Sequence, residues 1–347
     1  MLAAVYHGPN DLRAEEVPVP EIGKGEILVK VLSASICGTD LRIWHGNHRM
    51  YPAGTVRIPG HEVVGTIAEL SSDVTDHSVG QRVFCAPNTG CGHCLQCITG
   101  NNNLCAKYDA IGITSNGGFA EFVRISAKAV QQGNVIPIDE SVDPAVAALL
   151  EPFACVVRGQ NALRIQPGEV VLVMGAGPIG VMHAKLAKAR GAGRVIVSEP
   201  VPERLTQVAT MGADKIVNPA SEDLQAVVEA ETNGRGANVI IVAAPVHAAQ
   251  ESAVQLAAIG GRINFFGGLP KDRPTMALDA NLVHYKELLV TGTTACSTAD
   301  CWQAVQIVDS GIVDLAQLIS QRFPLREAAA AFAAAEDRKS LKVVLQP

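Results

Sequence analysis

The chain has 347 residues, 48% of them hydrophobic, and a formal net charge of −6; this length predicts two domains. No Lys/Arg-rich run is present, so nucleic acid is not an expected partner. The N-terminus lacks the basic-then-apolar pattern of a secretion signal. The longest apolar run, residues 170–184, contains three glycines and a proline and is too short to span a bilayer. We therefore expect a cytoplasmic protein without a membrane partner.

The first 150 residues are predicted to form an irregular, mostly antiparallel β domain. Short runs rich in β-branched residues alternate there with glycine, proline and other turn residues, which is typical of such sheets. The four clearest runs are residues 26–32, 63–69, 82–85 and 119–125. We expect each of these runs to be a short strand.

Four cysteines in this region have the spacing of a metal site. Cys91, Cys94, Cys97 and Cys105 are separated by two, two and seven residues, and in a cytoplasmic protein such a cluster more often binds metal than forms disulfides. A bacterial iron–sulfur motif would have three residues before its last cysteine and a proline after it, whereas Ala106 follows Cys105 here. Four thiolates suit a closed tetrahedral zinc site, so we expect a structural zinc.

A second set of metal-binding residue types is dispersed along the chain. Cys37 opens a Cys-Gly-Thr-Asp run, His61 and Glu62 lie in a Gly-His-Glu run, and Glu151 precedes a proline. Each residue alone has an ordinary structural interpretation. Together they offer a thiolate, an imidazole and carboxylates, the mixture that binds a catalytic zinc with one position left for substrate.

From about residue 165 the pattern changes to alternating strands and helices. Six apolar runs are predicted to be buried strands: residues 170–174, 194–198, 215–217, 238–243, 261–266 and 288–292. Residues 179–190 and 248–258 are the clearest helical segments between them. Parallel strands need crossover connections, so this order predicts a doubly wound, six-stranded parallel sheet of the Rossmann type.

The first of these strands runs into a glycine motif that is typical of dinucleotide binding. The motif is Gly175-Ala176-Gly177-Pro178-Ile179-Gly180. In this motif the first glycine makes the turn, the second lets the backbone approach a pyrophosphate, and the third lets helix and strand pack closely. The phosphate then lies at the helix N-terminus, where free amides and the helix dipole favour an anion.

Glu199, at the end of the next strand, indicates which dinucleotide is bound. It lies 24 residues after Gly175, where a carboxylate would accept hydrogen bonds from the ribose hydroxyls. The same carboxylate would repel a 2′-phosphate, and the next residue is Pro200 rather than an arginine. We therefore expect NAD rather than NADP.

The C-terminal part is predicted to contain helices over residues 299–310 and 326–336 and a closing strand over 341–345. With these elements placed, the whole chain resembles the zinc-dependent medium-chain alcohol dehydrogenase family. The similarity rests on the order of Cys-Gly-Thr-Asp, Gly-His-Glu, the cysteine quartet, Glu-Pro and the glycine motif. It implies a GroES-like catalytic domain from residues 1–151 and 293–347, with a structural zinc lobe, and a NAD-binding Rossmann domain over residues 152–292.

The resemblance also implies roles for individual residues and two zinc ions per chain. Cys37, His61 and Glu62 would bind the catalytic zinc, and Glu151 would bind it directly or through the metal-bound water. The cysteine quartet would hold the structural zinc. The remaining implied positions are Thr39 beside the zinc-bound substrate oxygen, Arg204 over the adenosine and Lys342 near the pyrophosphate.

Within the family, the chain is most similar to the sorbitol/iditol and L-threonine dehydrogenase branch. The similarity lies in Glu62 directly after His61, in Glu151 in place of a cysteine ligand, and in residues 284–287. These relatives place a proton-relay histidine five residues after the zinc cysteine, where this chain has Arg42. A guanidinium stays protonated and cannot relay protons. We expect Arg42 to hold cofactor phosphate or an oxygen-rich substrate, or else to face water.

The resemblance implies zinc- and NAD-dependent oxidation of a secondary alcohol of a polyol or sugar-like substrate to the ketone. An L-threonine 3-dehydrogenase-like activity shares every motif. A sugar- or polyol-phosphate substrate is a further alternative, because five basic residues crowd the loops that border the expected zinc site. An ordinary solvated basic loop is the preferred explanation for them. They are Arg42, His45, His48, Arg49 and Arg57. A non-catalytic zinc- and nucleotide-binding protein is the remote alternative.

We also expect a homo-oligomer, either a dimer or a homotetramer. This expectation comes from the resemblance and is supported by the apolar strand 288–292, which could end the sheet.

Overall fold

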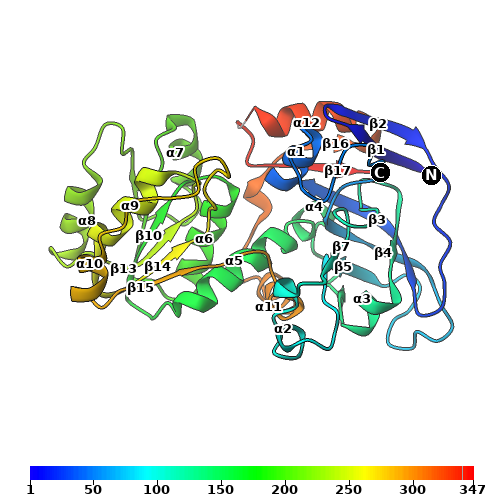
Figure 1. The fold of residues 1–347 in the computed structure, drawn as a ribbon, viewed down its shortest axis with the longest axis horizontal. Coiled ribbons are helices and arrows are strands. Elements are labelled where there is room, and N and C mark those ends of the chain that lie inside the picture. Colours follow the sequence, from blue (N-terminus) through cyan, green and yellow to red (C-terminus); the bar gives the residue numbers. More distant parts are fainter. Residues whose placement is uncertain (338) are drawn as a thin grey trace. The chain divides into compact units, whose positions relative to one another are not determined.

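The computed structural model describes residues 1–337 and 339–347 and divides into two compact units (Figure 1). Unit 1 comprises Met1–Ala154 and Cys296–Pro347, and unit 2 comprises Cys155–Ala295. Helix α5 (Leu150–Leu163) crosses the first division. Both divisions lie a few residues from the domain boundaries that we expect from the sequence. None of the described helices combines the length and the hydropathy that a membrane span requires.

Unit 1 is built on a seven-stranded sheet in the order β16-β17-β3-β4-β5-β9, with β8 also paired to β3. Its strand pairs are antiparallel except for β16 and β17, as the sequence predicts. Two further pairs, β1-β2 and β6-β7, are separate. The strands are β1 (Leu2–Gly8), β2 (Asp11–Glu16), β3 (Ile27–Ile36), β4 (Glu62–Leu70), β5 (Arg82–Cys85), β6 (Asn88–Thr89), β7 (Asp109–Ala110), β8 (Phe122–Ile125), β9 (Val135–Pro137), β16 (Ile319–Pro324) and β17 (Lys342–Gln346).

Strand β3 is the central strand of this sheet and is longer than the sequence predicts. The predicted run ends at residue 32 because Ser33-Ala34-Ser35 interrupts the apolar pattern. In the structure β3 continues to Ile36, because β4 and β17 pair with this last part on either side. The small side chains of Ser33 and Ser35 are fully buried there. This extension carries the chain directly to Cys37.

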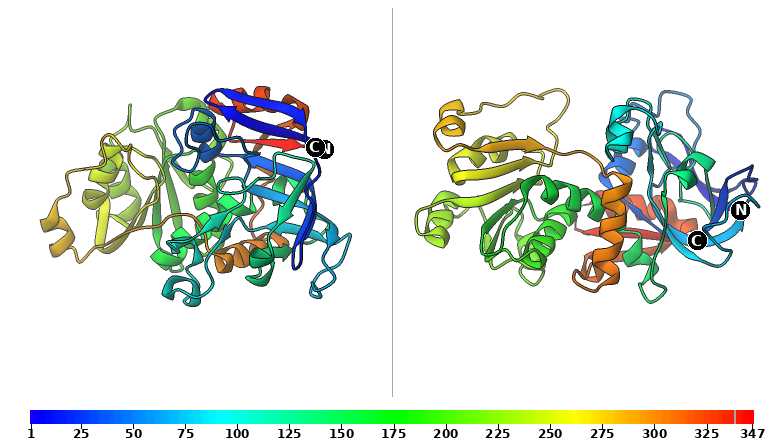
Figure 2. Two further views of the ribbon diagram at one scale, coloured as in Figure 1. Left: turned by 45° about the vertical axis from the view of Figure 1, so that its right-hand side comes forward. Right: turned by 90° about the horizontal axis from the view of Figure 1, so that it is seen from below.

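The helices that lie wholly within unit 1 are short, except for α11 and α12. They are α1 (Gly38–Trp44), α2 (Leu95–Ile98), η1 (Asn102–Leu104), α3 (Ala127–Gln131), α4 (Pro144–Ala147), α11 (Thr298–Asp309), η2 (Ala316–Leu318), η3 (Leu325–Glu327) and α12 (Ala328–Glu336). The predicted alanine-rich helix is confirmed as α12, which packs on the core through Phe332. The Phe332 ring meets Trp44 and Phe119 edge to face, with 5.7 Å between centroids in each pair. Figure 2 shows the C-terminal strand β17 running beside β3, as their pairing requires.

Unit 2 contains the predicted six-stranded parallel sheet, in the order β12-β11-β10-β13-β14-β15. All six predicted strands are confirmed. They are β10 (Val170–Met174), β11 (Arg194–Ser198), β12 (Lys215–Val217), β13 (Ala237–Val242), β14 (Ala257–Phe265) and β15 (Leu289–Gly292). The strand order reverses between β10 and β13, which makes this pair the topological switch point where ligands bind in open α/β sheets.

Five further helices connect these strands. They are α6 (Pro178–Ala189), α7 (Pro202–Val208), α8 (Leu224–Thr232), α9 (His247–Leu256) and α10 (Ala280–Tyr285). Most of helix α6 is buried, including Val181 and Leu186. The predicted helix 248–258 ends earlier, at Leu256, because the chain passes straight into β14 and pairs with β13.

Candidate active site, structural metal site and nucleotide loop

The candidate active site lies at one end of the unit 1 sheet. Strand β3 ends at Ile36 and the antiparallel strand β4 begins at Glu62, with Ser35 paired to Glu62. The residues just beyond these ends, Cys37 and His61, therefore lie side by side. The Cys37 Sγ atom is 3.1 Å from His61 Nε2. Two residues that are 24 positions apart in the sequence are thus joined by strand register.

Three of the predicted catalytic ligands form one group in the structure. One ligand atom each from Cys37, His61 and Glu62 lies within 4.8 Å of the other two. His61 and Glu62 are buried. The donors are a sulfur, an imidazole nitrogen and a carboxylate oxygen, the types that zinc accepts, and three protein ligands leave a position open for substrate. The residues present therefore fit a catalytic zinc.

Asp40 supports this group, and the sequence analysis did not assign it a role. Its carboxylate accepts a hydrogen bond from the Cys37 backbone N–H at 3.0 Å and lies 3.5 Å from His61 Nδ1. Asp40 is fully buried. A carboxylate on Nδ1 leaves Nε2 directed at the metal position, as in carboxylate–histidine–metal arrangements. The capping-box spacing from Cys37 to Asp40 was the available sequence signal.

Burial and neighbouring charges together govern the protonation of this group. Burial raises the pKa of Cys37 and raises the pKa of Glu62 to about 7, although the ammonium of Lys342 opposes the second shift. Burial also disfavours protonation of His61, but the neighbouring Cys37 and Asp40 outweigh it and raise the pKa of the imidazole. A metal ion competes for these donors with protons, so metal binding releases protons.

Lys342 lies against Glu62 and is buried. Its Nζ donates to Glu62 Oε2 at 2.5 Å and to the Ile36 carbonyl oxygen at 3.1 Å. The Ser35 hydroxyl donates to the same carboxylate oxygen of Glu62. These contacts give Lys342 partners other than the pyrophosphate that the family resemblance implies. The sequence carries no signal for them, because Lys342 and Glu62 are 280 residues apart.

Glu151 is close to this group but is not part of it. It lies in the first turn of α5, and its Oε1 accepts a hydrogen bond from the Cys296 thiol at 3.6 Å. Its charge adds to the effect of burial in raising the pKa of Glu62. This placement agrees with a role at the metal either directly or through a bound water.

The hydroxyl of Thr39 has a defined donor in Arg42. Arg42 Nη2 donates to Thr39 Oγ1 at 2.8 Å, while the Thr39 backbone N–H donates to Cys37 Sγ at 3.3 Å. Arg42 is exposed. Because a guanidinium only donates, the hydroxyl proton of Thr39 points elsewhere. Arg42, which replaces the histidine expected from the family resemblance, therefore contacts Thr39, a predicted site residue.

Two other basic residues of this region have structural partners. The two ring nitrogens of His45 lie 2.9 Å from Asn10 Oδ1 and 2.7 Å from Glu336 Oε1. The Arg57 guanidinium donates to the Met50 carbonyl at 3.2 Å, and its central carbon lies 4.9 Å from the centroid of a tyrosine ring. Because both side chains have partners within the fold, the presence of His45 and Arg57 in this region does not require a bound phosphate group.

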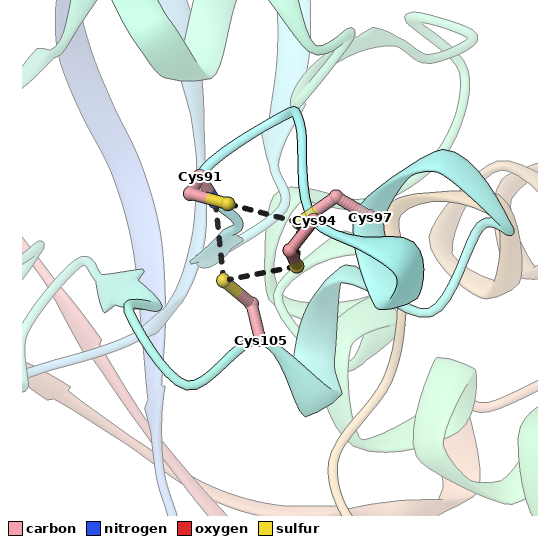
Figure 3. A group of neighbouring side chains, drawn as sticks. All are labelled: Cys91, Cys94, Cys97 and Cys105. Atoms are coloured by element: carbon pink, nitrogen blue, oxygen red, sulfur yellow. Dashed lines mark hydrogen bonds between the residues drawn. The ribbon is translucent and has the colours of Figure 1, made fainter.

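The predicted cysteine quartet is brought together in the lobe that contains α2 and η1 (Figure 3). Its Sγ atoms are 3.5 Å apart for Cys94–Cys97, 3.8 Å for Cys94–Cys105 and 4.0 Å for Cys91–Cys97. A tetrahedral zinc with Zn–S bonds of about 2.3 Å would separate its sulfurs by about 3.8 Å. The quartet therefore fits a structural zinc site.

Backbone amides favour the thiolate form of two of these cysteines, Cys91 and Cys105. The N–H groups of Cys91 and Lys107 donate to Cys105 Sγ at 3.3 and 3.4 Å. A backbone hydrogen bond at His93 is the main cause that lowers the pKa of Cys91 to about 6. Donors of this kind favour the thiolate, which is the metal-binding form.

The glycine motif follows β10 at the switch point of the unit 2 sheet. Gly175 has a φ of +110°, which disfavours other residues. A Cβ at Gly180 would collide with the Gly175 carbonyl oxygen, whereas a Cβ at Gly177 would meet only the guanidinium of Arg204 at 4.0 Å. Pro178 is the first residue of α6, and Ile179 and Gly180 follow it in the first turn. The backbone N–H groups of Ile179 and Gly180 have no partner within the helix, so they suit a phosphate.

Glu199 lies at the end of β11 and holds this loop. Its Oε2 accepts from the Ala176 N–H at 2.8 Å, and its Oε1 accepts from the Val201 N–H at 3.1 Å. Arg204 lies 4.0 Å from the same carboxylate. The predicted adenosine-side residues, Glu199 and Arg204, are therefore neighbours beside the glycine motif.

The chain matches two family models over most of its length. Residues 23–138 match the alcohol dehydrogenase GroES-like domain, and residues 178–310 match the zinc-binding dehydrogenase domain. The first match contains Cys37, the Gly-His-Glu run and the cysteine quartet. The second begins within the glycine motif.

Individual relatives cover nearly the whole chain. An L-threonine 3-dehydrogenase of Bacillus subtilis is 35% identical over 96% of this chain and 94% of its own length. A sorbitol dehydrogenase of the same organism is 32% identical over 100% and 97%. A zinc-binding dehydrogenase of Sinorhizobium meliloti, solved with bound NADP, is 32% identical and superposes with a TM-score of 0.89 over 100% of this chain and 99% of that one. The chain therefore belongs to the zinc-dependent medium-chain alcohol dehydrogenase family, whose members are oxidoreductases acting on CH–OH groups.

Proposed function

We propose that this chain oxidises a secondary alcohol of a polyol or sugar-like substrate to the ketone, with NAD as the hydride acceptor. The observation that carries the proposal is the buried group of Cys37, His61 and Glu62, whose ligand atoms lie within 4.8 Å of one another. These three residues would hold the catalytic zinc, with Glu151 as a direct or water-mediated ligand. Unit 1 would be the catalytic domain and unit 2 the NAD-binding domain.

The residues around the metal position would prepare the alcohol for oxidation. A bound zinc would supply Lewis acidity, polarising the oxygen of the alcohol. Asp40 would keep the imidazole of His61 turned so that Nε2 faces the metal. Thr39 Oγ1 accepts from Arg42 and keeps a second lone pair, with which it would accept the proton that the alcohol loses, while its own proton passes outward. The thiol of Cys296 would hold Glu151 in place through the 3.6 Å contact.

The second zinc would be structural and would be held by Cys91, Cys94, Cys97 and Cys105. In unit 2, the glycine motif and the first turn of α6 would receive the pyrophosphate of NAD, and Glu199 would accept from the ribose hydroxyls. Arg204 would lie over the adenosine. A cytoplasmic location stays a prediction.

An L-threonine substrate is the second candidate, and the observation that favours it is the relative at 35% identity. A sugar-phosphate substrate has weaker support, since His45 and Arg57 have partners of their own within the fold. Arg42 is the basic residue that contacts a proposed site residue and is exposed. A hydroxyl-rich or anionic substrate group could meet its guanidinium.

NADH absorbance with a panel of polyols, L-threonine and polyol phosphates tests the proposal. We expect turnover with at least one neutral polyol at a kcat/KM above that for L-threonine and the phosphates. A Cys37→Ser variant should abolish this turnover because it removes one metal donor. Efficient turnover of L-threonine alone would show that the substrate is an amino acid and not a polyol. Efficient turnover of the polyol phosphates alone would show that the substrate carries a phosphate.

A further inference from the structure

Three neighbouring strands bring their end residues together at the candidate active site. Strand β17 begins at Lys342 and β4 begins at Glu62, and β3 lies between them. In the register, Ser35 of β3 pairs with Glu62 on one side and with Val344 on the other. Lys342, Ser35 and Glu62 are 3%, 0% and 1% exposed. An ammonium, a hydroxyl and a carboxylate are therefore enclosed at one end of the sheet.

Both donors contact the same oxygen of the carboxylate. Lys342 Nζ donates to Glu62 Oε2 at 2.5 Å, and the Ser35 hydroxyl donates to it as well. A carboxylate oxygen has about two lone-pair directions, so these bonds fill the acceptor capacity of Oε2. The oxygen with capacity left for a metal ion is Oε1.

The ammonium of Lys342 lies in a region that contains several acidic groups. Burial disfavours the ammonium of Lys342, but the charges of Glu62, Cys37 and Asp40 outweigh it and raise the pKa of Lys342. Burial and the charge of Glu151 raise the pKa of Glu62. A buried carboxylate among like charges is costly unless a cation pairs with it. Lys342 supplies such a cation in direct contact with Glu62.

We propose that Lys342 and Ser35 are positioning residues for Glu62, which together occupy its Oε2, balance its charge and leave Oε1 for the metal ion. This inference rests on the proposed function, in which Glu62 is a metal ligand. Its consequence is that the site keeps its arrangement when the catalytic metal is absent, because Lys342 supplies positive charge that the metal otherwise adds.

Thermal unfolding of the full chain tests the charge pairing. The variants are Lys342→Met, Glu62→Gln and the double variant, each with its metal content measured, both zinc-loaded and after the catalytic zinc is removed by a chelator. We expect Lys342→Met to lower Tm by on the order of 10 °C in the metal-depleted form and by less in the loaded form. The double variant should recover much of that loss.

The control is Lys30→Met, which removes an exposed lysine from the same sheet and should leave Tm nearly unchanged in both forms. Additive effects of the two single substitutions in the metal-depleted form would overturn the pairing, because independent residues show no coupling. The pairing would also be overturned if Lys342→Met lowered Tm equally with and without the catalytic metal.

Visible absorption of the full chain with Co²⁺ in the catalytic position tests the positioning itself. Lys342→Met and Ser35→Ala should each shift the Co²⁺ bands, because the oxygen presented to the metal changes. Lys30→Met should leave the bands in place. Unshifted bands in both site variants would overturn the positioning role. Glu62→Gln separates this from the proposed function: if Glu62 is no ligand, that variant leaves the bands unchanged, whereas the coupling in Tm persists.

Discussion

The carboxylate of Glu199 links the nucleotide loop to its neighbouring strand. Both oxygens accept backbone N–H groups, from Ala176 and Val201, so the side chain is fixed at the position that we propose for the ribose. Each oxygen keeps a further lone pair for a hydroxyl. A 2′-phosphate would bring a second negative charge to a carboxylate that is only 4% exposed. Arg204, at 4.0 Å, offsets part of this charge.

We predict a preference for NAD over NADP that depends on Glu199. A Glu199→Ala variant should lower the ratio of kcat/KM with NAD to kcat/KM with NADP by about tenfold or more. A tenfold change corresponds to about 1.4 kcal/mol of differential binding. Glu203→Ala is the matched control, because it removes an exposed carboxylate from the start of α7. Equal efficiency with NADP in the wild type would refute the prediction, as would a ratio that Glu199→Ala leaves unchanged.

His183 is a buried histidine of α6 with no role in the proposed chemistry. Its Nδ1 lies 3.4 Å from the Gln160 side chain, and its ring meets Phe266 edge to face at 4.8 Å. Burial, with a smaller contribution from the charge of Arg190, lowers its pKa to about 3. The folded chain therefore keeps this imidazole neutral at pH values where an unfolded chain protonates it.

This difference predicts that His183 makes the protein less stable in mild acid. Below about pH 6.5 the unfolded state binds a proton that the folded state does not, so stability falls as pH decreases towards 3. The free energy of unfolding is measured with denaturant at pH 7.5 and at pH 5.5. His183→Met should reduce the decrease in this free energy between the two pH values by about 1.4 kcal/mol. His284→Met, at an exposed histidine of the same unit, should leave the loss as in the wild type. An unchanged loss in His183→Met would contradict the prediction.

At the scale of elements, the cysteine lobe depends on its metal more than on apolar packing. Helix α2 has no buried residue, and its Leu95 and Ile98 are 69% and 67% exposed. Burial of apolar side chains therefore stabilises this helix little. The four thiolates around a zinc ion would supply the stabilising interactions instead.

We predict two zinc ions per chain with different roles. Cys91→Ser should remove one zinc and lower the free energy of unfolding by more than about 4 kcal/mol, because structural zinc contributes directly to folding. Cys37→Ser should remove the other zinc and abolish activity with a smaller loss of stability. A chelator should extract the catalytic zinc first, since its coordination is open. Metal analysis that finds one zinc in the wild type, or iron, would contradict the assignment.

At the scale of the whole molecule, strand β15 is an edge strand of the unit 2 sheet in the part of the chain that the structure describes. Leu289 at its start is 52% exposed, and Ile259 and Tyr285 in the same unit are 81% and 77% exposed. An edge strand offers free backbone N–H and C=O groups and favours pairing with another chain. A second copy of this chain, related by twofold symmetry, would satisfy both copies at once.

We therefore predict a homo-oligomer, a dimer or a tetramer, that contains this edge. Light scattering at micromolar concentration should give at least twice the mass of one chain, and Leu289→Lys should lower it by placing charge in the interface. Val19→Lys, at an exposed apolar residue of unit 1, should leave the mass unchanged. A wild-type monomer would end this prediction.

Much of the fold of unit 2 was predictable from the sequence. Its strands are continuous apolar runs that are bounded by turn residues, and parallel strands with helical crossovers follow from that order. The glycine motif and Glu199 were predictable for the same reason, because their positions are set by one strand–turn–helix segment and the strand after it. In unit 1, β3 was underestimated because its last four residues are held by pairing with β4 and β17 and not by local preference.

The sequence by itself determined which chemical groups are present and which lie near one another along the chain: the cysteine quartet, the Gly-His-Glu run and the glycine motif. Only the tertiary structure decided which distant groups meet. Strand register brings Cys37 to His61 and closes Lys342 onto Glu62 across 280 residues, and helix α1 turns Asp40 towards His61 Nδ1. Such contacts depend on pairing between strands, and residue spacing along one strand carries no information about which residue of another strand will lie opposite.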